Sequence, residues 1–325
     1  MPVIYNPKFT PPILLRNNHL HTIYPVFFRK VKDVNYTRER LNLKDGDFID
    51  LDWQKNNAKK IALLIHGFEG STESLYLKAI AHAMLKSGWD IVGMNLRGCS
   101  GELNHLYRSY HSGATEDVFE VVDYLAEHYD YKEMTIVGFS LGGNMTLKYL
   151  GEAGNKLTPE ILKSAVGVSV PCDLGSAADK INWIYANRFL KSLKPKLIQK
   201  IKKHSPELTI EEVKKIKTLR EFDDIYTAPV HGYENAVNFY SKCSSKKFIK
   251  DIKIPTLLIS ALDDPFLTEG CFPFKQAEEN PDFYFLATQN GGHVGFVEFN
   301  ADGEYWLEKR IVDFTSKRLI NGQDK

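Results

Sequence analysis

Apolar and polar positions alternate in blocks that predict strands and helices in turn along most of the chain. Short continuous apolar runs, typical of buried parallel strands, occur at residues 61–65, 91–94, 135–137, 165–170, 256–260 and 283–286. Amphipathic segments at 75–86, 116–128 and 141–150 separate the first four runs and predict helices. A last amphipathic helix is predicted near residues 305–314. This alternation predicts an α/β fold, with a mostly parallel central sheet flanked by helices on both faces.

Three segments depart from the alternation. Residues 1–33 are rich in proline, aromatic and basic residues without a clear period, so we expect an extended N-terminal arm packed on the core. Residues 34–54 contain an Asp45-Gly46 turn between two strand-like runs, which predicts a hairpin. Residues 179–248 are Lys-rich and helical in pattern, with a capping box at Thr209 and Glu212. We therefore expect a core of 34–178 and 249–325, with 179–248 as a helical cap insertion.

The most informative motif is Gly138-Phe139-Ser140-Leu141-Gly142, which lies between a predicted strand and a predicted helix. This is the context of a nucleophile elbow, where a serine in a strained turn projects its hydroxyl above the sheet. Side chains at 138 and 142 would collide with the crossing backbone, and glycine removes them. The motif predicts Ser140 as a nucleophile and the Leu141 N–H as an oxyanion donor.

A second oxyanion donor is expected in the loop after an early strand. The loop His66-Gly67-Phe68-Glu69-Gly70 follows the strand at 61–65, and its Phe68 N–H is the candidate. His66 is interpreted as structural, because the base of this kind of site comes last in chain order.

The acid and the base are expected after late strands, in the order nucleophile, acid, base. Asp263 and Asp264 both follow the strand at 256–260, and spacing does not separate them; we favour Asp264 because Pro265 fixes the turn after it. His293, between glycines after the last strand, is the only histidine beyond them. The predicted triad is Ser140, Asp264 and His293, with Asp263 as the alternative acid.

Composition narrows the class of protein. The 325 residues carry a net charge of +1, without a basic arm or zinc-finger spacing, so a nucleic-acid partner is not expected. His19-x-His21 has no second ligand pair nearby, and the predicted chemistry requires no metal or cofactor. Scattered cysteines at 99, 172, 243 and 271 and the absence of a signal-like start favour a cytoplasmic location.

No apolar run approaches the length of a membrane span, so stable membrane insertion is not expected. The many lysines of the insertion are interpreted as a solvated helical face. A transient contact with anionic lipid is the alternative, because Trp183, Ile184, Phe189 and Leu190 begin the same segment. The sequence does not indicate an oligomeric state.

Several of these segments together resemble the YheT-like branch of the α/β-hydrolases, which also contains plant embryogenesis-associated proteins and membrane-anchored mammalian relatives. The resemblance covers nearly the whole chain and rests on residues 11–22, 66–71, 95–99, 110–113, 138–143, 170–174 and 222–232. It implies carboxylesterase activity, and some relatives act on lipid esters. The chain has no segment like the mammalian anchor, so we expect a soluble, bacterial-type member.

The sequence therefore predicts a serine carboxylesterase that cleaves small or medium acyl esters through an acyl-enzyme. Two hypotheses stay open on the same triad: transfer of the acyl group to an alcohol or thiol, and hydrolysis of lipid esters. A third hypothesis is a non-catalytic binding protein on a hydrolase fold, because a fold does not determine function.

Overall fold

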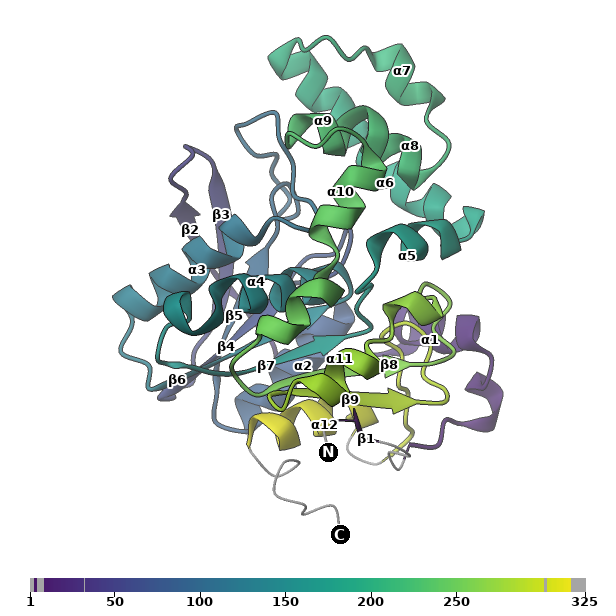
Figure 1. Cartoon of the computed structure of the whole chain (residues 1–325). Coiled ribbons are helices and arrows are strands. Elements are labelled where there is room, and N and C mark those ends of the chain that lie inside the picture. The colour runs from purple at the N-terminus through teal and green to yellow at the C-terminus, as the bar shows by residue number, and fades with distance from the viewer. Residues whose placement is uncertain (1–2, 5–8, 32, 301–302, 317–325) are drawn as a thin grey trace.

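A computed structural model describes residues 3–4, 9–31, 33–300 and 303–316 of the chain, and a single sheet runs through its centre (Figure 1). The strand order is β1-β9-β8-β7-β6-β4-β5-β3-β2. The strands are β1 (Val3–Ile4), β2 (Thr37–Asn42), β3 (Phe48–Gln54), β4 (Lys60–Ile65), β5 (Asp90–Asn95), β6 (Glu133–Phe139), β7 (Leu162–Val168), β8 (Thr256–Ala261) and β9 (Phe283–Thr288).

All neighbouring strands are parallel except at one edge, where β3 is antiparallel to both β2 and β5. The β2–β3 pair is the predicted hairpin, and its turn contains Gly46 with a positive φ of 84°. In β4, residues 61–65 are fully buried, because helices cover both faces of the sheet at this point. The predicted mostly parallel sheet is confirmed.

Two layers of helices enclose the sheet. One face carries α3 (Thr115–His128), α4 (Leu141–Leu157) and α11 (Phe274–Glu279). The other carries α2 (Leu75–Lys86) and α12 (Trp306–Thr315), which pack against each other (Figure 1). The helix α2 has the predicted bounds. β7 ends two residues earlier than predicted, because Ser169 adopts a left-handed conformation with φ 50°.

A helical insertion between β7 and β8 rises beyond one end of the sheet, as the green helices of Figure 1 show. Its long helix packs through Leu193 and Leu197 against Val213 and Phe222 of the shorter helices, so the insertion has a small core of its own. The helices between β7 and β8 are α5 (Leu174–Lys180), α6 (Trp183–His204), α7 (Ile210–Lys215), α8 (Leu219–Phe222), a π-helical turn (Asp223–Thr227), α9 (Ala228–Val230) and α10 (Ala236–Cys243), followed by a 3₁₀ segment (Ser245–Asp251) that crosses the predicted end of the insertion at 248. The predicted Thr209–Glu212 capping box is present at the start of α7.

The N-terminal segment is not the extended arm that its composition suggested. After a 3₁₀ turn at Ile13–Leu15, helix α1 spans Asn18–Phe28. The side chain of Asn17 caps it by accepting hydrogen bonds from the N–H groups of His19 and Leu20. The helix has apolar residues on its exposed face as well as on its buried face, and it contains Pro25, so the sequence shows no helical period. Within the described segments, no helix combines the length and the apolar composition needed to cross a bilayer.

Candidate active site

The turn between β6 and α4 holds Ser140 in a strained conformation, with φ 50° and ψ −117°. A Cβ on Gly138 would lie 2.5 Å from the carbonyl oxygen of Gly142. A Cβ on Gly142 would lie 2.5 Å from the carbonyl oxygen of His66. The two glycines are therefore required for this tight crossing, which lifts the serine above the carboxyl end of the sheet.

Three of the predicted side chains meet at this turn. His293 Nε2 lies 3.0 Å from Ser140 Oγ, and His293 Nδ1 lies 2.8 Å from Asp264 Oδ2. The Asp264 side chain is 0% exposed and that of His293 is 10% exposed. A carboxylate only accepts hydrogen bonds, so it assigns the imidazole proton to Nδ1 and leaves the Nε2 lone pair facing the serine hydroxyl. This arrangement allows proton transfer from the serine to the imidazole.

The two adjacent carboxylates have different partners. Asp264 contacts the imidazole through one oxygen, and its other oxygen accepts a hydrogen bond from the Phe266 N–H at 2.8 Å. Asp263 instead accepts hydrogen bonds from the Gly292 N–H at 3.0 Å and from the Asn290 side chain at 3.2 Å. Burial raises the pKa of Asp263. Asp263 thus holds the loop that carries His293, and Asp264 contacts the imidazole itself.

Helix α1 supports the same loop, which sequence reasoning missed. The hydroxyl of Thr22 accepts a hydrogen bond from the His293 N–H at 2.9 Å and donates one to the Asn18 carbonyl at 2.7 Å. The Asn18 side chain donates to the Asp263 carbonyl at 2.6 Å. A Cβ on Gly292 would lie 2.7 Å from the Asn18 carbonyl oxygen, so the loop lies directly against the helix. In the sequence these residues stand out only as a polar cluster at 17–22, and no local pattern indicates which distant segment they contact.

His21, which drew attention as half of a His-x-His pair, is a buried structural residue. Its Nε2 accepts a hydrogen bond from the Val297 N–H at 2.8 Å, and burial lowers its pKa to about 4. His66 is also structural, as expected. Its Nδ1 lies 2.8 Å from the Gly67 carbonyl, its Nε2 accepts from the Leu96 N–H at 3.1 Å, and burial lowers its pKa to about 4. Both imidazoles are neutral at physiological pH.

The two predicted oxyanion donors flank the serine. The loop after β4 lies against the elbow, because a Cβ on Gly67 would be 3.1 Å from Ser140 Cβ. Leu141 is the first residue of α4, so its N–H has no acceptor within that helix. Phe68 and Leu141 both line the cavity that contains Ser140. In the described part of the chain, neither of their N–H groups has a hydrogen-bond acceptor.

Glu69, next to Phe68, connects this loop to the insertion. Its carboxylate accepts hydrogen bonds from Tyr110 Oη at 2.9 Å, from Lys196 Nζ at 2.8 Å and from the Ser192 hydroxyl. Its own N–H donates to Tyr110 Oη at 2.9 Å, and its φ of 53° is left-handed. Ser192 and Lys196 belong to α6, so the long helix of the insertion holds the loop after β4 in place.

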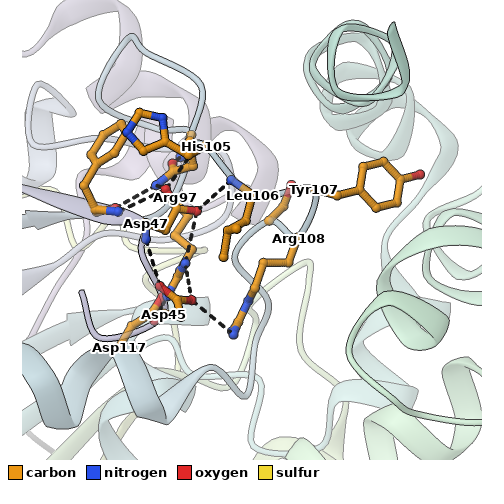
Figure 2. Close-up of polar contacts among 12 residues, drawn as sticks. Asp45, Asp47, Arg97, His105, Leu106, Tyr107, Arg108 and Asp117 are labelled. Carbon is orange, nitrogen blue, oxygen red and sulfur yellow. Dashed lines mark hydrogen bonds and ion pairs between the residues drawn. The ribbon is translucent and has the colours of Figure 1, made fainter. Parts of the chain in front are cut away.

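A buried charge cluster anchors the next loop, at residues 97–110 (Figure 2). Figure 2 shows Arg97 between three carboxylates, with nitrogen–oxygen distances of 2.6 Å to Asp117, 2.9 Å to Asp45 and 3.2 Å to Asp47. Asp47 also accepts hydrogen bonds from the backbone N–H groups of His105 and Leu106. The cluster ties the β2–β3 hairpin to the loop, and sequence spacing gave no sign of it.

The far side of this loop supports the insertion. In Figure 2 the Tyr107 ring points away from the charge cluster, and it packs on Tyr226 with ring centroids 5.4 Å apart. Lys200 of α6 donates hydrogen bonds to the carbonyls of Leu106 at 2.6 Å and Arg108 at 2.7 Å. Burial lowers the pKa of Lys200 to about 8.

A cavity of about 560 Å³ lies between the insertion, helix α1 and the elbow. Ser140 and His293 are among the residues that line this cavity, and most of the lining is apolar. The insertion contributes several of the lining residues, including Tyr185, Phe189, Leu219 and Phe222. Within the described ranges no cluster of three or more His, Cys, Asp or Glu side chains is arranged to hold a metal.

Comparison with known proteins agrees with this architecture. The family model described as the alpha/beta hydrolase fold matches residues 62–299. YheT of Escherichia coli (strain K12), whose name describes it as an esterase, is 36% identical, over 96% of this chain and 94% of that protein. Phospholipase ABHD3 of Mus musculus is 30% identical, over 89% of this chain and 73% of that protein.

Among solved structures, the Pyrococcus furiosus esterase Pf2001 has the same fold, with a TM-score of 0.60 at 16% identity over 96% of this chain and 99% of that one. The matched family model and the extent of the similarity to YheT lead to one conclusion. The chain belongs to the α/β-hydrolase fold family and, within it, to the YheT-like branch.

Proposed function

We propose that this chain is a serine carboxylesterase in which Ser140, His293 and Asp264 form the catalytic triad. The chain is a hydrolase of ester bonds, like the relatives that it resembles over nearly its whole length. The observation that carries the proposal is the line of contacts from Ser140 Oγ through His293 to Asp264, at 3.0 and 2.8 Å.

In the proposed reaction, His293 Nε2 takes the Ser140 hydroxyl proton as Oγ attacks the ester carbonyl carbon. The N–H groups of Phe68 and Leu141 donate hydrogen bonds to the oxygen that becomes negative, and Asp264 stabilises the imidazolium. The imidazolium then protonates the departing alcohol and leaves an acyl group on Ser140. Water, deprotonated by His293, attacks this acyl-enzyme, and the acid leaves as Ser140 regains its proton.

The apolar lining of the cavity supports small or medium acyl groups as substrates. We propose that the insertion, residues 179–248, caps this cavity and limits acyl length, because α6 and α8 supply part of its wall. The core is then 34–178 and 249–325, with 1–33 as an N-terminal unit that packs on it. The four cysteines are unpaired and buried, which supports a reducing, cytoplasmic location.

The test compares Ser140→Ala with Ser87→Ala, which changes the same residue type at the end of α2, outside the cavity. A fluorophosphonate probe should label the wild type and Ser87→Ala, and Ser140→Ala should be neither labelled nor able to hydrolyse p-nitrophenyl butyrate. Undiminished hydrolysis by folded Ser140→Ala would refute the assignment. A wild type that is never labelled would favour the non-catalytic binding protein.

Hydrolysis of lipid esters is a second candidate on the same triad. The similarity to Phospholipase ABHD3 favours it, and the apolar lining of the cavity is compatible with it. A panel of p-nitrophenyl esters and monoacylglycerols of increasing chain length separates the two substrate classes. Adding an acceptor alcohol and analysing the products separates hydrolysis from acyl transfer.

A further inference from the structure

The exposed apolar side chains of the chain are concentrated at one place. Of the thirteen large apolar side chains that are exposed in the described residues, ten lie on the segment around α1, on the first turn of α6 or on Phe299. We name this set the apolar rim; it consists of Ile13, Leu14, Leu20, Ile23, Val26, Phe27, Phe28, Trp183, Ile184 and Phe299. Several are extensively exposed, with Leu14 at 85%, Trp183 at 76% and Phe28 at 65%.

Contacts between side chains hold these segments together as one surface. His19 of α1 lies 3.1 Å from the Tyr185 hydroxyl of α6, and the two rings stack with centroids 5.8 Å apart. On the other side, Tyr24 stacks on Phe28 and meets the edge of Phe299. In Figure 1, α1 and the start of the insertion lie at the same edge of the molecule.

The apolar rim is continuous with the reaction cavity. Ile23, Val26 and Phe27 belong to the rim and also line the cavity that contains Ser140. In the insertion, Ile181 and Tyr185 line the cavity, and the rim residues Trp183 and Ile184 lie between them in sequence. The rim therefore adjoins the cavity that contains the serine.

The charged residues of the two segments that carry most of the apolar rim are all basic. Residues 9–31 and 181–206 contain ten Arg and Lys residues and no Asp or Glu. Arg16 and Lys191 are among the cations at the surface. Glu298, which precedes Phe299, is ion-paired with Lys309 at 3.2 Å. An apolar surface flanked by basic residues, with its neighbouring Glu298 neutralised in an ion pair, is complementary to an anionic lipid surface, where apolar side chains enter the headgroup boundary and cations meet phosphate.

We propose that the apolar rim docks on an anionic lipid surface and thereby opens the cavity directly toward membrane-dissolved esters. The cavity entrance then faces the bilayer, so an apolar substrate passes from lipid to the serine without crossing water. This proposal names the partner of the site in the proposed function, but binding to lipid does not require turnover. The two proposals can therefore fail separately.

The experiment measures co-flotation with vesicles of phosphatidylcholine and phosphatidylglycerol in equal amounts, and with pure phosphatidylcholine vesicles. The rim variant carries Leu14→Ser, Phe28→Ser and Trp183→Ser, three residues that are exposed and do not line the cavity. The control is Val237→Ser, which removes an apolar side chain that is 63% exposed and outside the rim.

We expect the wild type and Val237→Ser to float with the anionic vesicles, and more weakly with pure phosphatidylcholine or at high salt. The rim variant should bind at least about ten-fold more weakly, since burying each large apolar side chain is worth that factor or more. Its hydrolysis of water-soluble p-nitrophenyl acetate should equal that of the wild type. Ser140→Ala should still bind, which separates docking from catalysis.

Absence of wild-type binding to anionic vesicles, or equal binding by the rim variant, would overturn the proposal. Light scattering addresses the alternative occupant, a second copy of the chain. A wild-type dimer that the rim variant converts to a monomer would assign this surface to self-association instead.

Discussion

The assignment of the acid between two neighbouring aspartates gives the sharpest prediction. In Asp264→Asn the amide oxygen keeps the hydrogen bond from the Phe266 N–H, so the amide nitrogen faces His293 Nδ1. An amide N–H donates, and Nδ1 must then act as acceptor, which moves the imidazole proton to Nε2. The base can no longer take the Ser140 proton. We expect kcat to fall by roughly 10⁴-fold, equivalent to about 5.5 kcal/mol.

Asp263→Asn is the matched control. The amide oxygen can still accept from the Gly292 N–H, and the contact with the Asn290 side chain is lost. One hydrogen bond of this kind is worth about 1 kcal/mol, so kcat/KM should fall by less than about ten-fold.

Both variants are assayed for kcat and KM on p-nitrophenyl butyrate, and urea unfolding checks that each is folded under the assay conditions. A folded Asp263→Asn variant that loses as much activity as Asp264→Asn, or more, would refute the assignment. It would mean that the imidazole is oriented through the loop rather than through the carboxylate that contacts it.

Three further predictions follow from buried polar groups. Thr22→Val leaves the backbone N–H of His293 without its acceptor, at a cost of about 1–3 kcal/mol. We therefore expect kcat to fall while KM changes little, and Thr22→Ser to restore kcat. An unchanged kcat in Thr22→Val would contradict this. Arg97→Met leaves Asp117 and its neighbours without their cation, so the free energy of unfolding in urea should fall by about 3–5 kcal/mol, and adding Asp117→Asn should recover part of it; a loss no larger than for a surface substitution would argue against the cluster. His21 and His66 have pKa values of about 4 in the folded chain, compared with 6.5 ordinarily. As the pH falls, these two imidazoles are therefore protonated in the unfolded chain before they are protonated in the folded chain. The stability due to these neutral imidazoles is present above pH 6.5 and disappears as the pH falls toward 4, and urea midpoints that do not fall over this interval would contradict it.

The parts of the fold that the sequence predicted are those with a strong local signal. The apolar run 61–65 is continuous because both faces of β4 are covered, and the glycines at 138 and 142 are needed because backbone crosses at their Cβ positions. The chain order expected for a nucleophile, an acid and a base pointed to Ser140, Asp264 and His293, whose side chains lie together in the structure. Local pattern and spacing were enough for these features.

The parts that the sequence did not predict depend on contacts between distant segments. Asp263 and Asp264 are adjacent, and only the position of the His293 imidazole, 29 residues beyond Asp264, distinguishes them. Thr22 contacts the loop that carries His293, 271 residues away in the sequence, and no periodicity indicates such a contact. The helix around Thr22 was missed because its apolar residues face outward as well as inward.

The edge strand β1 has a consequence for synthesis of the protein. Val3 and Ile4 pair with Phe285 and Leu286 of β9, so β1 meets its partner only after about 280 further residues have been synthesised. At roughly 5–20 residues per second, β1 waits for between about 15 and 60 seconds. During that time its backbone N–H and C=O groups have no strand to pair with. A chain released before β9 has been made therefore lacks both His293 and the strand that pairs with β1.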